Sequence, residues 1–116
     1  MRLELDLSAK TICAGNCLVE RFEPTGVIPA CLMSFRGDFS IDDSAYRKHV
    51  RHVADVDGIS AITINGHAAE VHGLSFDEQR HALDLTKQEL GDSLPVVAGV
   101  YAEGSLEAAR IARMAT

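Results

Sequence analysis

Three short apolar runs, each followed by a helix-like segment, constrain the fold of this chain more than any other feature. The runs cover residues 26–32, 59–64 and 94–100. Each is rich in Val, Ile or Leu and lacks polar alternation, which is typical of buried strands covered on both faces. Because strands of this kind that alternate with helices form parallel sheets, the sequence predicts an α/β fold with the order β-α-β-α-β-α.

The segments between the runs carry helix signals. Between Asp42 and Asp57 the apolar residues share one helical face, and they are Tyr46, Val50, Val53 and Ala54. Ser75 and Glu78 have the spacing of a capping box, which predicts a helix that runs to Leu90 with Gly91 as its left-handed stop. A third stripe follows the last run, at Ala108, Ile111, Ala112 and Ala115. The basic run 47–52 is interpreted as the solvated face of the first helix.

Two architectures fit this order, a doubly wound sheet and a (β/α)8 barrel, and the spacing of the runs does not choose between them. No Gly-x-Gly-x-x-Gly follows the first run, where the sequence reads CLMSFRGDFS, and no Walker-type Gly-Lys-Ser/Thr is present. Nucleotide binding is therefore disfavoured.

Charge and cysteine content limit the partners and the compartment. The chain has 11 Lys and Arg against 17 Asp and Glu, which gives a scattered net charge of −6 and argues against nucleic acid. No apolar run approaches membrane-spanning length, so no membrane partner is expected. Cys13, Cys17 and Cys31 are an odd number without a secretory signal, which favours reduced thiols in the cytoplasm.

The turn NGHAAEVHG after the second run carries the first candidate site. His67, Glu70 and His72 invite a metal interpretation, but their spacing is not that of the His-Glu-x-x-His helix and no third His or Cys follows nearby. No metal is therefore expected, and Glu70 is interpreted as structural, through backbone hydrogen bonds in the turn or at the next helix. Cys13 and Cys17 begin an iron–sulfur pattern that Glu20 leaves incomplete.

Three stretches taken in order resemble the dihydrodipicolinate synthase/N-acetylneuraminate lyase family, the pyruvate-dependent class I aldolases and lyases. They are GVIPACLMSF, DGISAITINGHAAEVHGLSFDEQR and LPVVAGVYAEGSLEAARIA. The resemblance covers residues 26–116 and implies a (β/α)8 TIM barrel, of which this chain supplies about the first three βα units. Residues 1–25 would be an N-terminal extension, read as an edge strand or an arm.

The resemblance also implies a substrate site, with departures. In the family, two Thr residues of the second-strand turn grip the carboxylate of pyruvate and take part in a proton relay. Here those positions are His67 and Ala68, whereas Gly66 is retained and the Gly that follows is Ala69. The backbone amides can still bind a carboxylate, and His67 becomes a possible proton relay or carboxylate donor, or else an exposed loop residue.

Further departures lie after the other two strands. The family's Thr-Pro after the first strand is Met33-Ser34, and its Gly and Asn after the third are Tyr101 and Glu103. Because the active sites of such barrels lie at the carboxyl ends of the strands, Tyr101 joins the expected substrate-binding residues. An altered substrate is inferred.

The class I reaction needs a lysine that forms a Schiff base with a ketone. The chain has Lys10, Lys48 and Lys87, and none follows a predicted strand. The resemblance places the Schiff-base Lys on the sixth strand with a helper Tyr upstream, beyond this chain. It implies a lyase or aldolase for pyruvate or a related 2-keto acid, a homo-oligomer (commonly a tetramer), and no cofactor. The alternative is a non-catalytic barrel paralogue, or an inactive fragment, that binds a small carboxylic acid.

Overall fold

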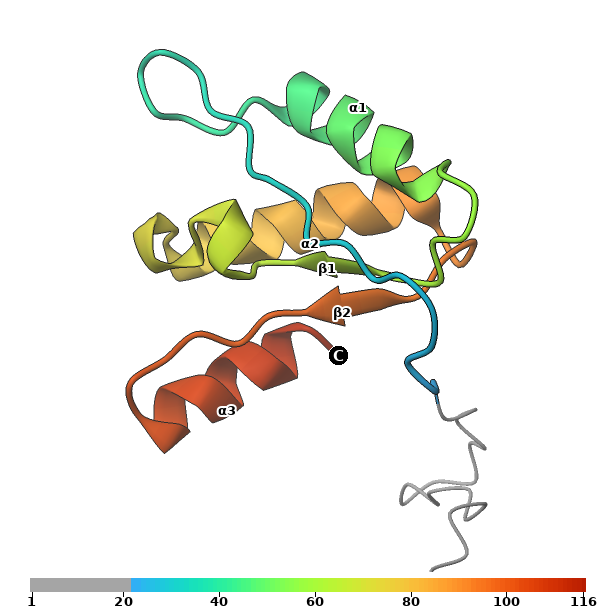
Figure 1. The fold of residues 1–116 in the computed structure, drawn as a ribbon. Coiled ribbons are helices and arrows are strands. Elements are labelled where there is room, and N and C mark those ends of the chain that lie inside the picture. The colour runs from blue at the N-terminus through green and yellow to red at the C-terminus, as the bar shows by residue number, and fades with distance from the viewer. Residues whose placement is uncertain (1–21) are drawn as a thin grey trace, which may run out of the picture.

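The computed structural model describes residues 22–116, which alternate between helices and short strands (Figure 1). The elements are α1 (Asp43–Ala54), β1 (Ile62–Ile64), the 3-10 turns η1 (His67–Ala69) and η2 (Val71–Gly73), α2 (Phe76–Leu90), β2 (Val96–Ala98) and α3 (Ser105–Met114). All three predicted helices are confirmed. Cys13, Cys17, Lys10 and most of the predicted extension lie outside the described residues. No helix within 22–116 is long and apolar enough to cross a membrane.

Three extended segments lie side by side in chain order. β1 and β2 are parallel, with Ile62 opposite Val96. On the other side of β1, segment 27–32 runs parallel to it through the isolated bridges Val27–Ile59 and Ala30–Thr63. The Cys31 amide donates to the Thr63 carbonyl at 2.8 Å. The chain therefore forms a parallel sheet in which each new segment adds beside the previous one, as predicted for βα units.

The first predicted strand was only partly right. Segment 27–32 is extended but forms bridges instead of a continuous ladder, and Pro29 within it has no N–H to donate. Val27 and Leu32 are 59% and 55% exposed, so the prediction of a buried strand was wrong except at Cys31, which is buried. The physical reason is that this segment has a neighbouring strand on one side only among the described residues.

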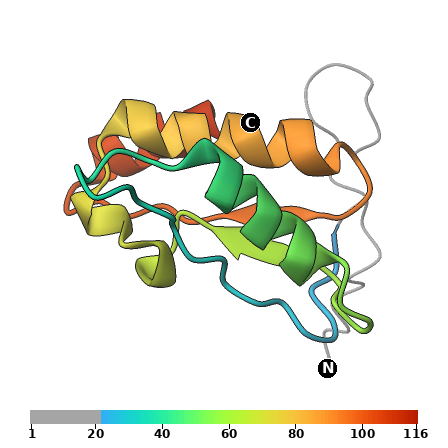
Figure 2. The ribbon, with the colours of Figure 1, turned by 90° about the horizontal axis from the view of Figure 1, so that it is seen from above.

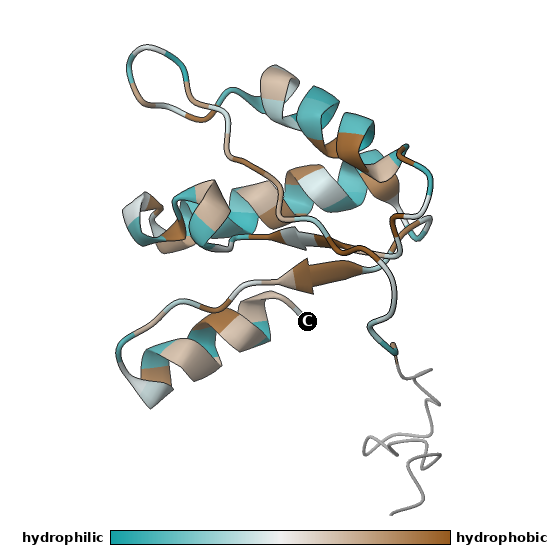
Figure 3. Ribbon diagram, in the orientation of Figure 1, coloured by the Kyte–Doolittle hydropathy of each residue, from teal (hydrophilic) through white to brown (hydrophobic). Residues whose placement is uncertain are grey.

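Within residues 22–116, helices cover one face of the sheet and no helix covers the other. Ile62 and Ile64 are fully buried and pack with Tyr46 and Val50 of α1 and with Leu85 of α2, and Figure 2 shows α1 lying across β1 and α2. On the opposite face Ala30, Thr63 and Val97 pair across the three segments, and none of them is buried. The prediction that both faces are covered was therefore wrong for the described residues, although β2 is strongly apolar (Figure 3).

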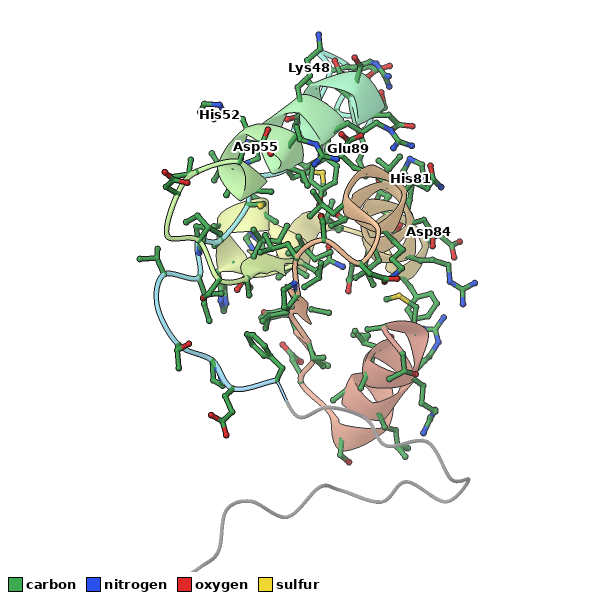
Figure 4. The ribbon with its side chains drawn as sticks, turned by 90° about the vertical axis from the view of Figure 1, so that its right-hand side faces the viewer. Lys48, His52, Asp55, His81, Asp84 and Glu89 are labelled. Atoms are coloured by element: carbon green, nitrogen blue, oxygen red, sulfur yellow. The ribbon has the colours of Figure 1, made fainter. Side chains whose placement is uncertain are left out.

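Polar contacts join α1 to α2. The Tyr46 hydroxyl lies 3.1 Å from that of Thr86, a buried hydrogen bond that confirms Tyr46 as a packing residue. Arg51 Nε donates to Glu89 Oε1 at 3.0 Å, and Glu89 lies between the two helices in Figure 4. The basic run 47–52 is thus not simply a solvated face, because its arginines bind the neighbouring helix. Only part of it, including Lys48, points away from the molecule (Figure 4).

The helix ends follow their sequence signals closely. Asp42 caps α1 by accepting from the Ala45 amide at 2.9 Å. Both halves of the Ser75–Glu78 capping box are present at the start of α2, as predicted. Gly91 ends α2 with φ 58° and ψ −127°, so its φ is positive as expected but its conformation is not left-handed helical.

Candidate functional site

The segment between β1 and α2 folds into two successive 3-10 turns at the carboxyl end of β1. Asn65 and Glu70 both have positive φ, 52° and 55°. Asn65 lies between β1 and Gly66, the N-cap of the first turn, and Glu70 joins that turn to the second. The Ala69 amide donates to the Gly66 carbonyl at 3.0 Å, and the Gly73 amide donates to the Glu70 carbonyl at 2.8 Å. The backbone of the segment is therefore held by its own hydrogen bonds.

Buried side chains anchor these turns to the first turns of α2. Asn65 Nδ2 donates to the Gln79 carbonyl at 2.9 Å, and Gln79 Nε2 donates to the Leu74 carbonyl at 3.1 Å. Ala69 and Val71 are buried below the turns. Because the anchors alternate with exposed positions, the turns present His67, Ala68 and His72 outward.

Gly99 brings the end of β2 against the first turn. Its amide donates to the Ile64 carbonyl at 2.8 Å. A Cβ at this position would lie 2.1 Å from the Asn65 carbonyl oxygen and 3.0 Å from the Gly66 nitrogen. Only glycine permits such an approach, so Gly99 fixes how closely the two strand ends meet.

The side chains of His67, His72 and Tyr101 meet at this edge of the sheet. The His67 and Tyr101 ring centroids are 5.7 Å apart with the planes at 81°, and those of His72 and Tyr101 are 6.4 Å apart at 65°. Tyr101 is 43% exposed, and both histidines are exposed. The structure thus brings together His67 and Tyr101, which the sequence predicted separately as site residues. Their roles stay predictions.

His72 was missed as a member of the site. The sequence pattern suggested His72 only as a metal ligand. Nothing in the spacing of 65–74 indicates the two consecutive tight turns that bring His72 to this edge. Within residues 22–116 no group of three His, Cys, Asp or Glu side chains is placed to hold a metal ion. Tyr101 contacts both imidazole rings. It follows Gly99 by two residues, so its position depends on the close backbone approach at that glycine.

Backbone donors are also available here. In η1 the first hydrogen bonds are made by the amides of Ala69 and Glu70. The amides of His67 and Ala68 precede them in the turn and make no backbone hydrogen bond within residues 22–116, so they are candidate donors for a ligand. Gly66, Ala68 and Ala69 can therefore contribute backbone groups only, whereas His67 adds an imidazole that can donate or accept a hydrogen bond.

The structural part of Glu70 is its backbone, not its carboxylate. Its amide and carbonyl link the two turns. The carboxylate that binds the start of α2 belongs to Glu78, whose Oε2 accepts from the Ser75 amide at 2.8 Å. Hydrogen bonds from the Ser75 amide and hydroxyl lower the pKa of Glu78.

The two described lysines lie away from this edge. Lys48 is on α1 and Lys87 on α2, and Lys87 pairs with Asp92. Lys48, Arg51 and His52 of α1 line a separate cleft together with Glu89 of α2. Neither lysine follows a strand, as predicted.

The parallel βα arrangement agrees with the comparisons with known proteins. The profile of the Dihydrodipicolinate synthetase family matches residues 23–116. The chain belongs to this family. The predicted resemblance is confirmed at the level of the family.

One curated relative of this chain is the N-acetylneuraminate lyase of Actinobacillus pleuropneumoniae serotype 5b (strain L20), which is 28% identical over 92 residues. That match covers 79% of this chain and 32% of the relative, so the chain spans about a third of the length of such lyases. A protein of Rhodopseudomonas palustris named ECF RNA polymerase sigma factor EcfG is 32% identical over 92 residues, which is 50% of its length. The name of this relative differs from those of the lyases. The fold of the present chain agrees with the lyases.

Solved structures give the same fold. CdNal from Clostridium difficile, in complex with mannosamine, is 26% identical with a TM-score of 0.75, and the match covers 81% of this chain and 32% of that one. A putative dihydrodipicolinate synthetase from Pseudomonas aeruginosa is 24% identical with a TM-score of 0.75, covering 80% and 32%. These neighbours are TIM-barrel members of the family. The described residues thus form an α/β portion similar to about a third of such a barrel.

Proposed function

We propose that residues 26–116 form the first three βα units of a (β/α)8 barrel lyase or aldolase. The complete enzyme would form or cleave a C–C bond on pyruvate or a related 2-keto acid. The observation that carries this proposal is the meeting of His67 and Tyr101, at 5.7 Å, where β1 and β2 end. Active sites of such barrels lie at this end of the strands. The proposed compartment is the cytoplasm, which suits the free, buried thiol of Cys31.

The open face of the sheet supports an incomplete barrel. Ala30, Thr63 and Val97 form a row across the three extended segments, and Val97 is 37% exposed. In a TIM barrel such inward rows are layers filled by side chains from the other strands. Further βα units would cover this row and pair the edge of β2 that has no partner strand among residues 22–116. We propose a homo-oligomer, by family a tetramer, for the complete protein.

The first turn is the proposed carboxylate site. A keto-acid carboxylate would accept hydrogen bonds from three donors: the amides of His67 and Ala68 and the imidazole of His67. Gly66 and Ala69 shape the backbone of the turn through their 3.0 Å hydrogen bond. Because Ala68 has no hydroxyl, a proton relay through this turn would depend on His67.

The carbon chemistry needs an amine that this part of the chain does not place at the strand ends. A lysine amine attacks the ketone carbon and water leaves, which gives an iminium that serves as the electron sink. Lys48 and Lys87 are on the outer helices. By resemblance to the family, the proposed Schiff-base lysine and its helper tyrosine belong to residues beyond Thr116, and neither a metal nor a dissociable cofactor is required.

Borohydride trapping tests this proposal. The natural polypeptide that carries this sequence is incubated with pyruvate, reduced with borohydride, digested and mapped by mass spectrometry. We expect a reduced pyruvate adduct on one lysine beyond Thr116, and none on Lys10, Lys48 or Lys87. A K87R variant, which changes an exposed helix residue, should retain the adduct. Absence of an adduct, or an adduct only on Lys10, Lys48 or Lys87, would contradict the proposed Schiff-base lyase.

A histidine variant tests the assigned turn. His67→Ala should lower kcat/KM for the keto acid by about 100-fold, a typical loss when a general acid–base group is removed. His81→Ala is the matched control, because His81 is an exposed histidine that pairs with Asp43 on the outer helices. Equal kinetics for both variants and the parent protein would reduce His67 to a loop residue.

A non-catalytic paralogue is the second candidate, and one observation favours it. Alanines occupy positions 68 and 69, so the turn has no side-chain hydroxyl. Such a protein would bind a small carboxylic acid through the amides of the turn without forming a Schiff base. Saturable pyruvate binding that leaves no borohydride adduct would identify this candidate.

A further inference from the structure

Three rings form one exposed cluster beside the proposed carboxylate turn. Tyr101 contacts His67 and His72 edge to face, with centroids 5.7 and 6.4 Å apart. Val100, next to Tyr101, is 46% exposed and adds apolar surface. Aromatic rings prefer this edge-to-face arrangement, and a further planar ring can join such a cluster in the same way.

Within the described residues, the segments around the cluster offer no cationic side chain for an anionic group beyond the keto-acid carboxylate on the turn. Residues 65–74 and 99–103 contain no Lys or Arg, and they include Glu70 and Glu103, both exposed. A distal phosphate or second carboxylate on a substrate would ordinarily require a guanidinium or ammonium group. The hydrogen-bond donors of the two segments are imidazoles, amides and a phenol, and their charged side chains are the carboxylates of Glu70 and Glu103.

We propose that His67, His72 and Tyr101 form the subsite for the second, carbonyl-bearing substrate, and that this substrate is planar, aromatic and uncharged. The keto acid would lie on the turn, and the ring of the second substrate would pack against Tyr101 beside it. His72 and Tyr101 are then specificity-determining residues. The assignment of the partner as an aldol substrate rests on the proposed function, whereas the ring preference of the subsite is a property of these side chains alone.

An equilibrium binding experiment tests the subsite without requiring catalysis. Benzyl alcohol and cyclohexylmethanol, two uncharged probes of similar size, are titrated into the natural polypeptide labelled with ¹³C at the histidine rings. His67 and His72 signals are assigned with His67→Gln and His72→Gln variants. We expect benzyl alcohol to shift both signals and to bind about threefold or more tightly than cyclohexylmethanol, in keeping with the strength of one aromatic pair. His81, on α2, serves as the internal control that should not shift.

A pair of variants separates ring recognition from general apolar binding. Tyr101→Leu keeps an apolar side chain at an exposed position and should abolish the preference for benzyl alcohol. Phe39→Leu is the matched control, because Phe39 is an exposed aromatic in the 36–40 turn and should leave the preference unchanged. Equal affinities in the parent protein, no shift at His67 and His72, or a preference that persists without Tyr101 would each overturn the proposal. Because trapping with pyruvate is measured separately, failure of the lyase proposal and failure of this one are distinguishable.

Discussion

The regions around β1 and β2 differ although their sequences are almost equally apolar. Ile62 and Ile64 of β1 are fully buried, whereas Val96 and Val97 of β2 are 36% and 37% exposed. β1 has an extended neighbour on each side and the α1–α2 layer above it. Among the described residues β2 pairs with β1 alone. The comparison shows that burial here follows from having neighbours on both sides, not from composition.

The helices repeat this contrast. α1 and α2 are joined by the buried Tyr46–Thr86 hydrogen bond and by Arg51 with Glu89. α3 is joined to α2 by Arg110, whose guanidinium lies 3.7 Å from the centre of the Phe76 ring, a contact worth about 0.5–1 kcal/mol at an exposed site. The β2–α3 region is therefore expected to unfold locally before the β1 region.

The largest expected effect separates the two strands directly. Ile64→Ala should destabilise the fold by about 2–5 kcal/mol, because it leaves a cavity in the core. Val97→Ala should cost less than about 1 kcal/mol, because Val97 is already partly in water. Urea denaturation of the two variants measures both values, and similar losses would show that β2 is as well packed as β1.

The next effect concerns the contact between the two strand ends. Gly99→Ala should cost about 2–3 kcal/mol, because its Cβ would collide with the Asn65 carbonyl and push the first turn away. The loss of ring contact should appear as changed His67 and Tyr101 signals in NMR spectra. Gly73→Ala is the control, because a Cβ there would meet nothing within 4 Å. Equal tolerance of both substitutions would mean that the strand ends do not meet as described.

A smaller fall in the free energy of unfolding should appear at alkaline pH, and its source is two buried groups in the core around β1. Burial raises the pKa of Cys31 to about 11 and that of Tyr46 to about 12. The neutral forms therefore favour the folded state, and their contribution, complete below the unfolded pKa values of 9.0 and 10.0, is lost as pH rises through the folded values. The free energy of unfolding should fall by about 1–2 kcal/mol between pH 8 and pH 10.

A Cys31→Ala variant provides the control for this titration. Its loss of stability between pH 8 and pH 10 should be less than half that of the parent protein, because only Tyr46 then remains to ionise in the unfolded chain. An unchanged pH dependence would show that the buried thiol is not its source.

The helices were predictable because their signals are local. Ser75 and Glu78 are three residues apart and satisfy one another's backbone, so the capping box needs no tertiary information. The strands were harder. Apolar side chains alone predict burial at Val27, Leu32 and Val97. Each of these residues lies where the described residues provide no covering layer. Exposure depends on which segments are adjacent in space, and the local pattern does not contain that information.

The candidate site was predictable in part. The family resemblance placed His67 and Tyr101 after two different strands, and the parallel register brings them together. His72 and Gly99 were missed for a physical reason. The position of His72 depends on two consecutive tight turns joined at Glu70, and the role of Gly99 is a close backbone approach between residues distant in the sequence.

A titration with pyruvate, followed by ¹H–¹⁵N NMR on the natural polypeptide, tests the assigned site most directly. We expect the amides of His67 and Ala68 to shift in a saturable way, because they are the backbone donors that we propose for the carboxylate. Saturable shifts confined to the basic cleft of Lys48, Arg51 and His52, or no shift in the turn, would contradict the assignment.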